Sequence, residues 1–96
     1  MNEEYNVKHF DVNFSDCRSV GELYLELKQK LELPDWCGEN LDALWDALTG
    51  IMYTPAAISV TKTTAWEDIQ EHANAIVAVM QEAEMEYREI TVRILE

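Results

Sequence analysis

Three short segments have the residue pattern of β-strands, and helical sequence separates each from the next. Residues 5–12 (YNVKHFDV) and 89–95 (EITVRIL) alternate β-branched or aromatic residues with polar ones, and residues 56–60 (AAISV) form a short apolar run. Strands that are joined through helices usually pair in parallel, with right-handed crossovers. The sequence therefore predicts an α/β fold, a three-stranded parallel sheet packed against helices, with the middle strand central or well covered.

Two helices are expected between the first and second strands. The first follows Ser19, whose spacing to Glu22 is that of a capping box, and Pro34 is expected to close it. The second is expected to begin at Asn40 as its N-cap. Gly50 stands where a glycine in the left-handed conformation commonly ends a helix.

The last helical region covers residues 66–87, after another candidate capping box at residues 64–67. It is expected as two helices that meet near residues 72–74, with one long helix as the alternative. Two helices give the element order β-α-α-β-α-α-β. No linker rich in proline, glycine or serine interrupts the 96 residues, so residues 1–96 are expected to form a single domain.

Charge is the strongest feature of the composition. Nineteen acidic residues against seven basic ones give a formal net charge of −12. This charge repels nucleic acid and anionic membranes and attracts basic proteins, although an acidic surface can also serve solubility alone. No apolar run is long enough to span a membrane and the first residues do not form a secretory signal, so a cytoplasmic protein is expected.

The sequence gives no indication of a metal or another cofactor. The two cysteines, Cys17 and Cys37, form no pair of the Cys-x-x-Cys type and no cluster with histidine. In a reducing compartment two such cysteines are expected to be free thiols rather than a disulfide.

The helix expected after Asn40 carries two acids that its apolar face does not explain. Asp42 and Asp46 are four residues apart and therefore stand on the same side of the helix, which Thr49 continues. Like charges at this spacing destabilise a helix by about 0.2–0.5 kcal/mol. Asp42 in the first turn is favoured by the helix dipole, whereas Asp46 lies mid-helix, where aspartate is a weak helix former.

Three interpretations of these acids are open from the residues alone. They are solvated surface acids, or a general acid and base pair or metal site of an enzyme, or binding residues. The sequence places no histidine, lysine or third carboxylate beside them that would support an enzyme. A binding protein would insert a carboxylate, flanked by Trp36, Asn40 and Thr49, into a cationic pocket of its partner.

A longer run around these acids resembles a known family. Leu33-Pro34 and the unbroken segment 38–50 (GENLDALWDALTG) resemble the signature of the barstar family, intracellular inhibitors of barnase-type ribonucleases. Pro55 before a strand and the closing EITVRIL segment also fit. The resemblance therefore extends over nearly the whole chain, with weaker similarity outside the helix.

The resemblance implies the parallel sheet with packed helices that the element order predicts. It also implies a protein that blocks the active site of an RNA-cleaving enzyme and is not itself an enzyme. The expected partner is a basic, extracellular-type ribonuclease similar to barnase, or a related nuclease toxin, bound by a monomer. An acidic interaction or immunity module that binds a different basic protein is the alternative.

The resemblance also implies roles for particular residues. Asp46 matches the carboxylate that takes the place of an RNA phosphate and meets arginine and histidine side chains of the enzyme. Asp42 matches a second acid that pairs with basic groups, and Glu82 matches an outlying acid. The implied partner-binding positions are Trp36, Gly38, Asn40, Asp42, Asp46, Thr49 and Glu82.

Three residues near these positions, Trp45, Cys37 and Ile51, are expected to play other parts than the implied binding residues. The spacing of Trp45 with Leu41 and Leu48 predicts that its ring packs in the core. Cys37 and Ile51 stand where the best-known member of the family has a tyrosine and a tryptophan. These two departures predict an altered rim of the interface and therefore a different choice of partner.

Overall fold

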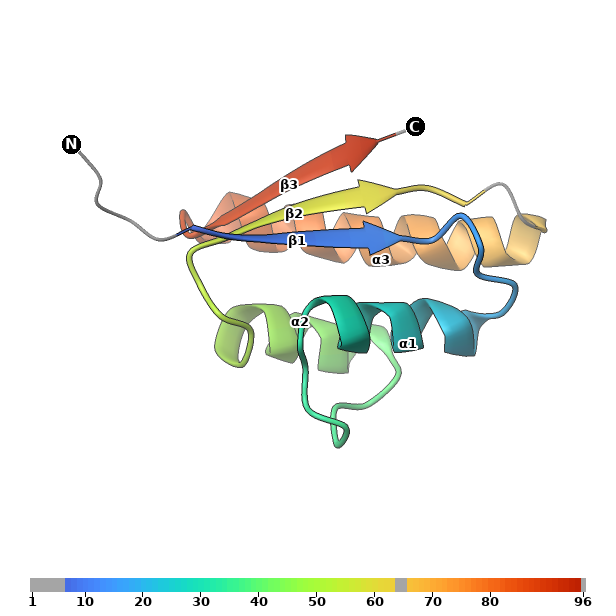
Figure 1. The fold of residues 1–96 in the computed structure, drawn as a ribbon, viewed down its shortest axis with the longest axis horizontal. Helices are drawn as coiled ribbons and strands as arrows, with labels where there is room; N and C mark the ends of the chain where they lie inside the picture. Colours follow the sequence, from blue (N-terminus) through green and yellow to red (C-terminus); the bar gives the residue numbers. More distant parts are fainter. Residues whose placement is uncertain (1–6, 64–65, 96) are drawn as a thin grey trace.

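The computed structural model describes residues 7–63 and 66–95, and Figure 1 shows them as a sheet with helices packed against it. The elements in chain order are β1 (Lys8–Asn13), α1 (Val20–Lys30), α2 (Leu41–Gly50), β2 (Ala56–Thr61), α3 (Glu67–Glu86) and β3 (Ile90–Leu95). The strand order is β1-β2-β3 and both pairs are parallel. The predicted fold class and the central place of the middle strand are confirmed. Tyr5 and Asn6, the start of the first predicted strand, lie outside the described residues.

The last helical region is one helix, so the element order is β-α-α-β-α-β and the predicted division near residues 72–74 is wrong. The buried residues of α3 follow one another at helical spacing without a break: Ile69, Ala73, Ile76, Val77, Met80 and Ala83. Asn74 lies on the exposed side. Its weak helix propensity therefore costs little against the burial of a continuous apolar stripe.

Helix α1 ends at Lys30, before Pro34, through a closure that does not use glycine. The Leu33 N–H donates to the Lys28 carbonyl at 2.9 Å, and Glu32 has a positive φ of 58°. This is the geometry of a Schellman motif with glutamate at the position that glycine usually takes. The prediction that Pro34 closes the helix is therefore wrong, since the proline lies in the following loop.

The end of α2 also differs from its prediction. Gly50 is the last helical residue, and no described glycine has a positive φ. The N–H groups of Ile51 and Met52 both donate to the Ala47 carbonyl, at 3.1 and 2.8 Å. Both bonds engage the Ala47 carbonyl, and the chain leaves the helix without a left-handed glycine.

The two predicted capping boxes have different outcomes. Ser19 is the N-cap of α1, and its hydroxyl accepts a hydrogen bond from the Glu22 N–H at 3.1 Å. The Glu22 carboxylate accepts from the Arg18 N–H at 2.7 Å, one residue before the cap itself. The second box cannot be followed because Thr64 and Ala65 lie outside the described residues. Trp66 is the N-cap of α3, and its side chain makes no capping bond.

All three helices contribute to one hydrophobic core on one face of the sheet. Along β1, Phe10 and Val12 are buried, while His9, Asp11 and Asn13 on the other face are exposed. The largest fully buried side chains come from strands, helices and connecting segments alike: Phe14, Leu23, Leu27, Leu31, Leu48, Ile58, Ile76, Met80, Val12 and Val60. Figure 1 shows α1 and α2 together below the sheet. No helix of the described residues covers the opposite face of the sheet.

The cysteines lie inside this structure. Cys17 and Cys37 are both buried and free. Burial raises the pKa of the Cys17 thiol, and the neighbouring carboxylates of Glu26, Glu22 and Asp16 add to the shift. In residues 7–63 and 66–95 no helix is long and apolar enough to cross a membrane, and no group of histidine, cysteine, aspartate and glutamate side chains is arranged to hold a metal.

Two methionines on α3 allow a matched test of this core. Met80 is 0% exposed and Met85 is 86% exposed. Met80→Ala should lower the free energy of unfolding by about 2–5 kcal/mol, because it removes apolar contacts and leaves a cavity. Met85→Ala should change it by less than about 0.5 kcal/mol. Urea titrations followed by circular dichroism measure both values, and similar losses for the two variants would contradict the packing described here.

Candidate functional site

The start of α2 and the loop before it form one close-packed unit. Asn40 is the N-cap in an extended conformation, and its Oδ1 accepts a hydrogen bond from the Ala43 N–H at 2.8 Å. A Cβ atom on Gly38 would lie 3.2 Å from the Ala43 Cβ and 3.3 Å from the Asn40 side chain. Any larger residue at position 38 would therefore press on the cap. The fit between loop and cap sets where α2 begins and which way it faces.

One face of α2 is held by the core. Leu44, Ala47 and Leu48 are buried, and Trp45 is half-buried against the same cluster. The Trp45 ring lies 6.4 Å, centroid to centroid, from the ring of Tyr87 at the end of α3. The prediction that Trp45 is a packing residue is confirmed. With this face fixed on α3 and the core, the opposite face of α2 points to solvent.

That opposite face carries Asp42 and Asp46, both exposed. Neither carboxylate makes an ion pair or hydrogen bond with another described residue. Asp42 lies in the first turn, where the helix dipole stabilises an acid, but Asp46 lacks this benefit. Two unpaired like charges at this spacing lower helix stability slightly, and nothing within the described chain compensates for them.

The acids of α2 belong to a longer stretch without cations. From residue 31 to residue 61 the chain has five acidic residues and no lysine, arginine or histidine: Glu32, Asp35, Glu39, Asp42 and Asp46. Two of these are paired from outside the stretch, because Lys8 lies 2.6 Å from Glu32 and Lys28 lies 3.4 Å from Glu39. The side chains of Asp35, Asp42 and Asp46 are exposed and pair with no described residue.

Lys28 has a role at the site that the sequence did not indicate. Its side chain is only 17% exposed, and its Nζ reaches both the Glu39 carboxylate and the Asp35 carbonyl, at 3.4 and 3.5 Å. The lysine thereby ties the loop before α2 to α1. Its position near the end of α1 is equally well explained by the helix dipole, so no sequence signal separates the two roles.

Tyr24 lies under the same loop. Its hydroxyl is 2.8 Å from His72 Nε2, which links α1 to α3. Burial raises the pKa of Tyr24, and the negative charge of Glu39 raises it further. The hydroxyl therefore stays neutral and hydrogen-bonded beneath the acidic loop.

The remaining predicted partner-binding residues differ in their exposure to solvent and in their hydrogen bonds. Trp36 is 75% exposed in the loop before α2. Thr49 is half-buried, and its hydroxyl donates to the Trp45 carbonyl at 2.8 Å, which leaves its oxygen free only as an acceptor. All predicted positions except Glu82 thus lie on one segment, residues 36–49. Glu82 is exposed on α3, which packs against α2, and no hydrogen bond or ion pair joins it to α2 within the described part.

The sequence is similar to proteins of one known family. The family model described as Barstar (barnase inhibitor) matches residues 7–95. The chain belongs to the barstar family. A protein of Bacillus subtilis (strain 168) described as "Putative ribonuclease inhibitor YrdF" is 37% identical over 76 residues, which cover 77% of this chain and 82% of that protein. The family predicted from residues 38–50 is confirmed.

The two departures from the family's best-known member lie in different environments. Cys37 is buried, so this position offers no side chain to a partner. Ile51 is exposed directly after α2 and presents an aliphatic side chain at the C-terminal end of that helix. Of the two, only Ile51 therefore lies where a partner can touch it.

The N-cap of α2 can be tested without a partner. Asn40→Ala should lower the free energy of unfolding by about 1 kcal/mol, because the Ala43 N–H loses its acceptor. Asn74→Ala, on the exposed face of α3, is the control and should be neutral or slightly stabilising, since alanine is the better helix former. Guanidinium titrations of the three proteins give the comparison, and a loss for Asn74→Ala as large as that for Asn40→Ala would argue against a specific capping bond.

Proposed function

We propose that this chain inhibits a barnase-type ribonuclease by laying α2 and the loop before it over the enzyme's phosphate-binding active site. The observation that carries the proposal is the exposed pair Asp42 and Asp46, which has no cation to neutralise it within the described chain. Membership of a family described as barnase inhibitors supports the ribonuclease as the target. The described relative, whose name is that of a ribonuclease inhibitor, supports the same class.

The chemistry of the target matches this surface. An enzyme that cleaves RNA must hold a phosphate, and arginine, lysine and histidine are the side chains that do so. Asp46 offers two oxygens that can accept bidentate hydrogen bonds from such a site. It breaks no internal ion pair when it binds, so its desolvation is not increased by the loss of a partner within the described chain. In the complex Asp46 would take the place of an RNA phosphate.

The other positions would support that contact in different ways. Asp42, one helical turn earlier, would pair with basic groups beside the phosphate site. Trp36 would bury its exposed ring against the enzyme, as aromatic anchors commonly do in interfaces. Glu82 would add an ion pair from α3. Because α2 is fixed by its buried face, Asp42 and Asp46 are positioned before binding, which lowers the entropy cost of association.

A different basic protein is the second candidate partner. Ile51 is the observation that favours it, because an exposed aliphatic residue follows α2 at a position where the resemblance implies an aromatic one. An enzymatic role fits the site less well. Asp42 and Asp46 are exposed, and no described side chain hydrogen-bonds to either carboxylate to position it for proton transfer.

The central contact is tested by one substitution. Asp46→Ala should weaken binding to a catalytically disabled barnase-type ribonuclease by at least about 100-fold, or about 3 kcal/mol, because cations in the enzyme's phosphate site would lose their partner. Asp68→Ala removes the same charge from an exposed position on α3 and should cost less than about 1 kcal/mol. Titration calorimetry measures both affinities.

Equal small losses for the two variants would mean that total charge, not a site, produces the affinity. If the unmodified protein and Asp46→Ala bind equally tightly, Asp46 is not part of the binding site, but the proposal that the chain inhibits the ribonuclease stands. No binding by the unmodified protein would contradict the ribonuclease target. Pull-down from the native cell with Asp46→Ala as the negative control would then test for the different basic partner.

Ionic strength gives an independent test of the charge argument. The association rate should fall steeply between about 0.05 and 0.5 M salt, because exposed charges are screened over roughly 10 Å at 0.1 M. The barstar family itself provides a standard example of such electrostatic steering, so the expectation follows from family membership as well as from charge. Stopped-flow fluorescence measures the rate. An association rate that does not change with salt would contradict the role of the acidic face in encounter.

A further inference from the structure

The outer edge of β3 is partly closed by a side chain from α3. The Ala56 N–H of β2 donates to the Glu89 carbonyl at the start of β3. The backbone N–H and C=O groups of the odd-numbered residues of β3 therefore point toward β2. By alternation along the strand, Ile90, Val92 and Ile94 direct their backbone groups to the outer edge. The Ile90 N–H donates to Tyr87, and the Val92 N–H donates to the Glu84 carboxylate at 2.9 Å.

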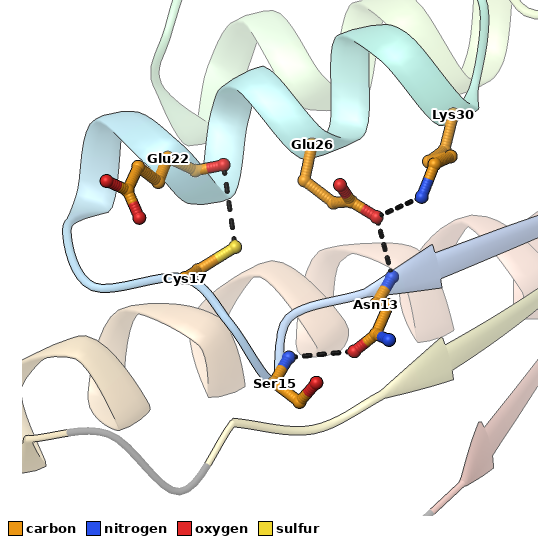
Figure 2. A network of polar contacts seen from close by, with 6 residues as sticks. All are labelled: Asn13, Ser15, Cys17, Glu22, Glu26 and Lys30. Atoms are coloured by element: carbon orange, nitrogen blue, oxygen red, sulfur yellow. Dashed lines mark hydrogen bonds and ion pairs between the residues drawn. The ribbon is translucent and has the colours of Figure 1, made fainter.

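The opposite edge of the sheet has the same arrangement. The Phe14 N–H donates to the carbonyl of Thr61, the last residue of β2, so the Asn13 N–H points to the outer edge of β1. It donates to the Glu26 carboxylate of α1 at 2.8 Å (Figure 2). Figure 2 also shows the Lys30 ammonium group beside the same carboxylate oxygen, Oε2, which lies 2.7 Å from its Nζ. Hydrogen bonding to Glu26 raises the pKa of Lys30, which stays charged and holds the carboxylate in place.

Each edge strand of a three-stranded sheet offers unpaired backbone groups to another strand. A glutamate from the flanking helix occupies one of these groups at each edge, although neither bond is needed to build the ladder between the strands. Acidic residues elsewhere on these helices, such as Glu82 and Glu86, are exposed and make no such bond within the described chain. The two bonded glutamates therefore share a position relative to the sheet edge.

We infer that Glu84 and Glu26 act as edge guards, side chains that keep a second copy of this chain from adding a strand to the sheet. The edge of β3 is where the guard matters most. Its sequence ITVRIL is rich in β-branched residues, and Val92 and Ile94 are apolar and only half-buried. Two copies would pair their β3 edges antiparallel about a two-fold axis.

The net charge of the chain also opposes self-association, as the edge guards do, but it acts on every approach of a second copy and not at the strand edge in particular. A net charge of −12 repels a second copy at low ionic strength, and salt screens this repulsion. The hydrogen bond of Glu84 is short-ranged and persists in salt. The two effects therefore separate when self-association is measured at low and at high ionic strength.

The test compares Glu84→Ala with Glu86→Ala, which removes the same charge two residues further along α3. Alanine favours the helix, so both variants are expected to fold, as circular dichroism will check. Sedimentation equilibrium at high salt measures the association constant for dimerisation. This constant should be at least about tenfold larger for Glu84→Ala than for Glu86→Ala or the unmodified chain. Glu84→Gln, which keeps an acceptor oxygen, should stay close to the unmodified chain.

Three results would overturn the inference. Glu84→Ala could remain as monomeric as Glu86→Ala, Glu86→Ala could associate equally well, or Glu84→Gln could associate as strongly as Glu84→Ala. Hydrogen exchange on the unmodified chain adds a test that needs no variant. The Val92 amide should exchange at least about tenfold more slowly than the Ile94 amide, and equal rates would remove the bond on which the guard depends.

Discussion

Burial of the apolar face of α2 is the constraint on which the rest of the structure depends. Leu44 and Leu48 enter the core and Trp45 closes their flank, so the helix cannot rotate without exposing them. Each buried leucine contributes about 1.5–3 kcal/mol, whereas two aspartates one turn apart cost about 0.2–0.5 kcal/mol. The core term is several times larger. The helix can therefore hold Asp42 and Asp46 toward solvent as a fixed pair at small cost.

The ion pairs near α2 lie in the loop before it and leave the exposed face of the helix negatively charged. The pairs Lys8–Glu32 and Lys28–Glu39 engage acids near the ends of the preceding loop. Exposed pairs of this kind contribute at most about 1 kcal/mol, so their main effect is to hold the loop in position. They leave Asp42 and Asp46 untouched. The loop is ordered by cations from β1 and α1, while the face offered to a partner remains wholly acidic.

Sequence patterns predicted the elements of this fold better than the ways in which they end. The strands, the N-cap Asn40 and the apolar stripe of α2 depend on local spacing, which the sequence displays directly. The end of α1 depends on Glu32, whose positive φ is usually found at glycine. No residue type in the sequence therefore indicates where this helix ends. The continuity of α3 depends on which side of the helix Asn74 faces, and burial against distant strands decides that.

The candidate site divides in the same way. Residues 36–49 form one segment, and an unbroken motif located them. The tether from Lys28 and the bond from Glu84 to Val92 join residues from different elements. Neither position differs, in sequence, from an ordinary lysine or glutamate on an exposed helix face. Contacts of this kind require the three-dimensional arrangement, because side-chain direction relative to a loop or a sheet edge decides them.

The acidic residues of the chain thus divide by what they touch rather than by where they lie in the sequence. Asp46 has no partner in the described chain and stays available to cations of another protein, whereas Glu84 has its oxygen on a strand amide. An acidic surface without the second kind of residue would repel copies of itself only through screened charge, which weakens at physiological ionic strength. A hydrogen-bonded carboxylate at the strand edge does not weaken in this way. If α2 binds its partner as proposed, unpaired acids on α2 and bonded acids at the sheet edges would together favour a basic protein over a second copy of the chain.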